Sequence, residues 1–292
     1  MVPLTISNTR VVCDMGKHKC KENTPSLLHS RRAIALPVTF LMLFVSLVLL
    51  ISATYYFSII RISAKTQELK VSGIEQEMLS LEKVAKFVAW SPGSYEIHEF
   101  GDFGGKFKLI PTAKRLILNV TDNSSFYDVF FNDSTGKVGY EAQLSEAQDI
   151  VFLKGDSRVI VNQSSSTMTQ LYISQGIEYY EITLSYRPLT GSTVTGSSSG
   201  KPVNSLRVYI VSLNSSQTIT RLGSFRLKVS CLNVASSWQS YNFSYPVTSL
   251  WVKADLDSVF GQVSLPISSN ALGAIVNLET IICSMKMEDI GW

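Results

Sequence analysis

The pattern of hydrophobic and polar positions divides the chain into three regions, of which the first is an apolar run. From Ala33 to Ile60 there are 28 residues without a charged side chain, and Arg61 ends the run. A helix needs about 20 apolar residues to cross a bilayer, whereas the apolar part of a removed signal peptide has about 7–15. The length therefore predicts a lasting transmembrane helix over residues 33–60, with aromatic residues 55–57 as an interfacial belt.

The second region, residues 61–91, has the spacing of an amphipathic stalk helix. Apolar residues recur every three or four positions: Val71, Ile74, Met78, Leu81, Ala85 and Val88. Nothing after Ile60 breaks the helix before Ser91-Pro92-Gly93, so we expect one continuous helix from Ile34 to Ala89, with Gly73 as a hinge. The apolar stripe packs either against the chain's own outer domain or against a second copy.

In the third region, residues 95–292, the period changes to two. Short alternating segments such as YEIHEF, KRLILNV and SLRVYIVSL are separated by Gly, Asn and Asp turns. This pattern predicts an α+β fold: a long N-terminal transmembrane helix and stalk, followed by a mostly antiparallel β-sandwich-like extracellular domain. The Ser/Gly/Thr-rich run from Pro188 to Asn204 is expected to be a flexible loop. A subdivision near residue 195 is the alternative to a single unit.

Charge and glycosylation motifs orient the predicted span. The net charge of +3 is too small to indicate a nucleic-acid partner, but residues 1–32 carry six Lys/Arg against two acidic residues. Six Asn-x-Ser/Thr motifs all lie after the span, at Asn119, Asn123, Asn132, Asn162, Asn214 and Asn242. Because such acceptors are modified on the exported side, we expect a basic cytoplasmic tail over residues 1–32 and the β domain outside the cell membrane.

Residues that could carry chemistry are few. Cys231 and Cys283 lie on alternating strands of the outer domain, and they either form a disulfide or remain buried thiols. Cys13, His18 and Cys20 lack the spacing of a zinc ligand set. His98 is the one histidine beyond the span, and we expect it to be a solvated strand residue. These observations predict no enzyme, cofactor or metal site.

The start of the apolar helix carries a family resemblance. Arg31, Arg32 and Ala33 precede Ile34, with Pro37 early in the helix, and an amphipathic extension and a β-rich domain follow. This order resembles archaeal type IV pilin-like and archaellin-like surface proteins. The resemblance implies cleavage by a signal peptidase near Arg32-Ala33-Ile34 and packing of the helices in a filament. The acidic residue of bacterial pilins near the start of the mature helix is absent, which favours an anchored subunit.

Together, these features predict a single-pass cell-surface protein with a non-catalytic ectodomain and a structural or adhesive role. Its expected partners are the lipid bilayer and either itself, through the helix, or other envelope proteins. The alternative is a carbohydrate- or peptide-binding module on a helical stalk. Trp238, Tyr241, Tyr245 and Trp251 could form its binding face, although core packing is the more common use of such residues.

Overall fold

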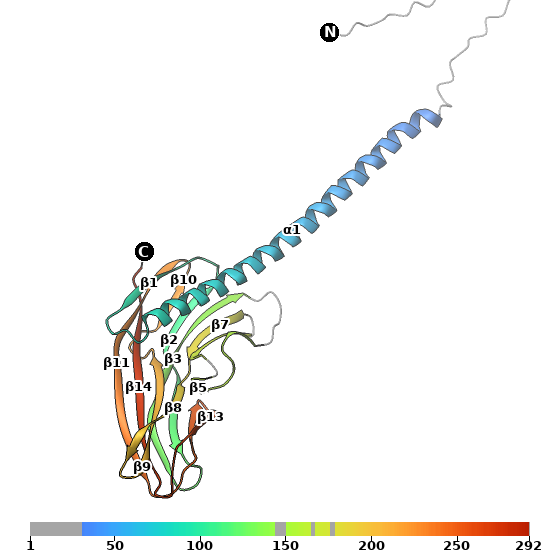
Figure 1. The fold of residues 1–292 in the computed structure, drawn as a ribbon. Coiled ribbons are helices and arrows are strands. Elements are labelled where there is room, and N and C mark those ends of the chain that lie inside the picture. Colours follow the sequence, from blue (N-terminus) through green and yellow to red (C-terminus); the bar gives the residue numbers. More distant parts are fainter. Residues whose placement is uncertain (1–30, 144–149, 165–166, 176–178, 292) are drawn as a thin grey trace, which may run out of the picture. The chain divides into compact units, whose positions relative to one another are not determined.

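The computed structural model of the chain describes residues 31–143, 150–164, 167–175 and 179–291. The chain divides into two compact units between Ile62 and Ser63. Helix α1 (Arg31–Val88) contributes to both of them, and every strand belongs to the second unit (Figure 1). The domain boundary therefore lies within the helix, close to the predicted junction between span and stalk.

Helix α1 is one 58-residue helix, as the sequence predicts, and it ends one residue before the expected Ala89. Trp90 has a φ of 70°, in the left-handed region that ends helices. The hydroxyl of Ser94 donates to the carbonyl of Val88 at 3.0 Å and so satisfies one terminal acceptor. The Ser91-Pro92-Gly93 breaker thus follows the helix directly.

Two curled, mostly antiparallel sheets form the rest of the second unit. In spatial order, the first sheet contains β1 (Tyr95–Phe100), β11 (Phe225–Phe243), β14 (Ala274–Asp289), β9 (Lys201–Ser212), β8 (Leu189–Ser198) and β5 (Val161–Asn162). The second contains β13 (Val259–Pro266), β12 (Ser249–Leu256), β2 (Lys106–Thr121), β3 (Tyr127–Gln143), β7 (Tyr179–Tyr186), β6 (Thr169–Gln175) and β4 (Val151–Lys154), and β10 (Ile219–Leu222) pairs with β2. The pairs β9–β14 and β5–β8 are parallel.

The interior consists of two hydrophobic clusters, which differ in whether α1 takes part. In the first, buried side chains of α1 pack with both sheets, and Phe100, Phe107 and Phe225 stack on one another at centroid distances of 4.8–5.0 Å. In the second, β2 and β12 of one sheet meet β9 and β14 of the other. We call these the helix cluster and the sheet cluster. The helix therefore completes one half of the domain's core.

The predicted stalk stripe is the part of α1 that fills the helix cluster. Five of its six members are buried at 1% exposure or less: Ile74, Met78, Leu81, Ala85 and Val88. Val71 is partly buried beside them. The stripe thus packs against the chain's own β domain, and it is not available to pack against a second copy.

Gly73 is a close-contact position, not the hinge that was expected. Helix α1 continues through it without interruption. A Cβ atom added there would lie 2.5 Å from Cε1 of Phe103, which is too close for real atoms. The missing side chain therefore lets the Phe103 ring pack directly against the helix.

Several loops expected from composition are instead strands. The run from Pro188 to Asn204 forms the β8–β9 hairpin, and both residues of its tight turn, Ser199 and Gly200, have positive φ. Residue 195 thus lies inside a hairpin and not between subdomains. Residues 132–137 have the Asn, Asp and Gly composition of a turn, but they lie within β3.

Candidate functional site

The exposed part of α1 is long and apolar enough to cross a membrane. From Pro37 onwards the structure gives one such helix among the described residues, and none of its apolar window is buried. Phe40 is 74% exposed and Leu43 is 70% exposed. Side chains of this kind find a favourable environment in lipid, so the helix surface is compatible with a single-pass membrane protein.

Three hydroxyl side chains in this segment bond to the backbone of the helix itself. The hydroxyls of Ser46, Thr54 and Ser58 donate to carbonyls three or four residues earlier, at 2.7–2.8 Å. Because the bilayer core offers no water, a hydroxyl there needs an internal acceptor. The segment therefore presents no unpaired hydroxyl at these three positions.

A buried carboxylate attaches the extramembrane part of α1 to the second sheet. Glu82 is 1% exposed and accepts hydrogen bonds from Lys154 of β4 at 2.5 Å and from Thr169 of β6 at 2.9 Å. Burial, together with the nearby Glu82 charge, raises the pKa of Tyr186. The Tyr186 hydroxyl has no hydrogen-bond partner among the described residues. The contacts of Glu82 with Lys154 and Thr169 fix which face of the helix lies against the sheet and where along the sheet it lies.

His98 makes a second polar contact between α1 and the first sheet. Its side chain is buried, contrary to the expectation of a solvated residue, and Nε2 lies 3.0 Å from the Glu77 carboxylate. Burial lowers the pKa of His98, and the opposing effect of Glu77 is smaller. The imidazole packs edge-on against Phe100. We read His98 as a structural contact between β1 and α1.

The structure brings Cys231 and Cys283 together under the end of α1. Both are buried free thiols with their Sγ atoms 3.6 Å apart, on neighbouring strands β11 and β14 beside a bulge at residues 231–233. Burial raises the pKa of Cys283 to about 12, so its thiol is protonated and unreactive in the folded domain. The disulfide stays a prediction, and the geometry identifies the pair that would form it.

The six sequons differ in accessibility. Asn123, Asn132 and Asn242 are exposed, whereas Asn119, Asn162 and Asn214 are partly buried. Asn119 lies near the end of β2, where that strand is paired with both β3 and β12, and its Oδ1 is buried. Asn123 lies in a tight β2–β3 turn where Asp122 accepts three backbone hydrogen bonds. The three exposed Asn residues are therefore the better acceptors for glycan in the folded protein.

Arg32, Ala33 and Ile34, the predicted processing site, lie at the start of α1.

The candidate aromatic face is partly exposed. Trp238 is 59% exposed and Tyr245 is 38% exposed, whereas Tyr241 and Trp251 are partly buried. The Tyr241 hydroxyl donates to Asp128 at 2.6 Å, and its ring packs edge-on against Phe126. Phe126 and Tyr245 in turn contact Phe243. These aromatics therefore close one end of the sheet cluster and leave Trp238 projecting into solvent.

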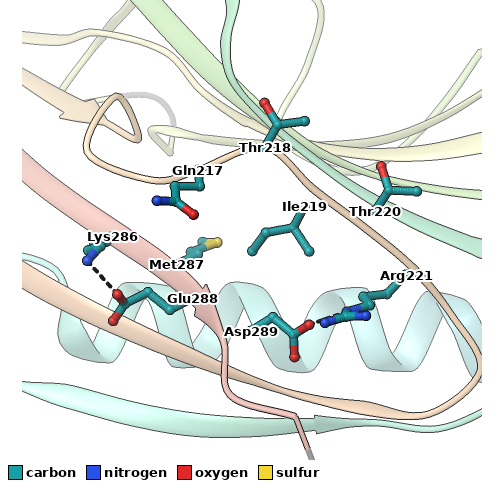
Figure 2. Close-up of a pocket in the computed structure, with 9 residues that line it drawn as sticks. All are labelled: Gln217, Thr218, Ile219, Thr220, Arg221, Lys286, Met287, Glu288 and Asp289. Carbon is teal, nitrogen blue, oxygen red and sulfur yellow. Dashed lines mark hydrogen bonds and ion pairs between the residues drawn. The ribbon is translucent and has the colours of Figure 1, made fainter.

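A polar groove of about 380 Å³ lies between β10 and the end of β14 (Figure 2). Residues 217–221 and 286–289 line it. Figure 2 shows two ion pairs in the groove: Arg221 of β10 with Asp289 of β14, and Lys286 with Glu288 along β14. All four charges in the groove are thus neutralised by their neighbours, which gives it no net attraction for a charged ligand.

Metal-ligand chemistry is sparse in the described part of the chain. Those residues include no group of three or more His, Cys, Asp or Glu side chains placed to hold a metal ion. Cys13, His18 and Cys20 lie outside the described residues.

Comparison of the chain with protein-family models, with curated proteins and with solved structures gave no match. The pilin-like resemblance therefore depends on the sequence of the N-terminal helix region alone, roughly residues 31–90.

Proposed function

We propose that this chain is a single-pass membrane-anchored surface protein whose sandwich-like β domain serves a structural or adhesive role outside the cell. The observation that carries the proposal is the charge-free, exposed segment of α1, followed in the same helix by a buried stripe. The first part suits lipid, and the second belongs to the core of the β domain. Such an arrangement presents a folded domain at a membrane surface.

The orientation rests on two sequence asymmetries. All six sequons lie in the β domain, and three of their Asn residues are exposed. The basic excess lies before the helix, as the positive-inside rule expects for a cytoplasmic tail. We therefore assign residues 1–32 to the inside and the domain to the outside.

Pilin-like processing near Arg32-Ala33-Ile34 is the closest variant of this proposal. N-terminal sequencing of the native membrane-bound chain separates the two forms. An intact N-terminus supports an anchored protein. A chain beginning near Ala33 or Ile34 supports a processed subunit, and in that case contacts between copies come from the apolar part of the helix, because the stalk stripe is buried.

A second candidate function is carbohydrate binding at the exposed aromatics. The Trp238 side chain is 59% exposed on β11, and an exposed aromatic ring suits the apolar face of a sugar. A glycan array probed with the detergent-solubilised full chain tests this. The full chain is needed because a fragment starting at residue 95 would lack the part of α1 that completes the helix cluster. Binding that is lost in Trp238→Ala supports the candidate function, and no binding contradicts it.

A further inference from the structure

Strand β11 has a long unpaired edge. Its first half pairs with β1 from Phe225 to Ser230, and backbone bonds from residues 93 and 94 extend that pairing to Cys231. Beyond this point the described part of the chain supplies no partner for β11 except β14, so residues 232–242 have one unpaired backbone edge. Nine of these 11 residues are exposed and two are partly buried. This is the longest unpaired edge among the described strands.

The neighbouring part of the second sheet is open on the same side. Residues 127–135 of β3 pair with β2, and pairing with β7 begins at Lys137. The contact of Tyr241 with Asp128 places these two edges next to each other. Inward-facing positions of β11 consequently stay accessible: Gln239, opposite buried Leu278, is exposed.

Residues 232–242, with the sequence LNVASSWQSYN, lack the features that normally protect such an edge. Proteins usually block long edge strands with charges, Pro or a short strand length. This segment contains no Asp, Glu, Lys, Arg or Pro. By contrast, the edge strand β1 carries Glu96 and Glu99, and β4 is short and carries Lys154. An uncharged edge favours an uncharged incoming strand. A charged side chain on that strand would lose hydration on pairing and would find no opposite charge on β11.

We propose that residues 232–242 of β11 pair, antiparallel, with the same segment of a second copy of the chain. An identical uncharged strand brings no like charges into opposition, and a two-fold axis repeats every contact on both copies. Eleven residues of strand extend over roughly 36 Å, enough for a continuous ladder between the two sheets. This contact would join copies through their β domains and does not depend on the membrane anchor.

The test introduces a charge at the middle of the edge in the detergent-solubilised full chain. Ser237 is exposed in the single chain, so Ser237→Lys leaves its folding unchanged but places two lysines together across the two-fold axis. Light scattering should show a dimer for the unaltered chain and about tenfold weaker association for the variant. Ser197→Lys, on the exposed edge of β8, is the matched control and should remain dimeric.

A mixing experiment distinguishes this interface from association through α1. Ser237→Lys and Ser237→Glu chains, labelled with donor and acceptor fluorophores, should each fail to self-associate and should give energy transfer when mixed. That rescue arises only if position 237 of one copy lies near position 237 of the other. A monomeric unaltered chain, or a dimer that Ser237→Lys leaves intact, would overturn the proposal.

Discussion

At the residue scale, Gly73 has the clearest consequence. Ala is intrinsically better in a helix than Gly by about 1 kcal/mol, but at this position its Cβ would collide with Phe103. We predict that Gly73→Ala lowers the free energy of unfolding by about 1–3 kcal/mol, as expected for overpacking. Thermal unfolding of the full chain, followed by tryptophan fluorescence, measures this effect.

The matched control for that prediction is the double variant Gly73→Ala/Phe103→Leu. Leu lacks the ring atoms that approach Gly73, so the second change should recover part of the loss. If Gly73→Ala is stabilising by itself, Phe103 does not pack against the helix as described.

The cysteine pair supplies the second prediction at this scale. We expect Cys231 and Cys283 to form a disulfide before folding buries them. Their two protons and two electrons pass to the disulfide of an exchange partner in the exported compartment, which is reduced to two thiols. In denaturant without reductant, two of the four cysteines should then resist alkylation, and reduction should release them. Alkylation of all four without reductant would show that the pair remains as thiols.

How far the sequence predicts the molecule is also clearest from single residues. The 3.6-residue spacing identified the buried apolar positions of α1 from Ile74 to Val88, because one helix face must meet the core. Spacing could not choose between the chain's own domain and a second copy as the partner. His98 and Glu82 were not recognised as contacts because each bonds to a residue distant in the chain.

At the scale of elements, polar composition wrongly predicted a loop where a strand is rich in Ser and Thr. Residues 189–198 look like a linker, yet Thr suits strands, and Ser199-Gly200 supplies the two positive φ angles of a tight hairpin. The unpaired edge of β11 likewise could not be foreseen, since edge position depends on strand order. The aromatic residues on it were recognised from the sequence, but their position was not.

The attachment of α1 to the β domain depends on the Glu82–Lys154 pair. Lys154→Met should leave the buried carboxylate with Thr169 alone and lower the free energy of unfolding by about 3 kcal/mol. The double variant Glu82→Leu/Lys154→Met removes both charges and should be more stable than Lys154→Met. Chemical denaturation of the three chains compares them, and equal stability of Lys154→Met and the unaltered chain would contradict a structural role for the pair.

The apolar half of α1 can be tested in the same way. Leu47→Lys together with Leu50→Lys should disfavour membrane insertion by about 3 kcal/mol for each substitution, because both lie mid-span. Ser58→Lys with Ile59→Lys is the control, since lysines near the helix end can reach the interface. Alkaline extraction should release the Leu47→Lys/Leu50→Lys variant from membranes and should leave the Ser58→Lys/Ile59→Lys variant in them. Retention of both pairs would argue against insertion of this segment.

At the scale of the whole molecule, the core of the β domain is completed by the same helix that carries the exposed apolar segment. Removing the stalk would therefore expose the helix cluster, not only shorten a spacer. For the same reason we expect the β domain to need residues from about 70 onwards for a stable fold. Asn123 and Asn132 are exposed outside β11, so a second copy on the β11 edge would leave these two sequons open to glycan.

Membrane topology is the central claim, and protease accessibility on intact cells tests it most directly. Chains with one epitope at each terminus are treated with an external protease and then detected by both epitopes. The account predicts that the C-terminal epitope is lost, while the N-terminal epitope remains in a membrane-bound fragment. Protection of the C-terminal epitope on intact cells, with digestion only after lysis, would contradict it.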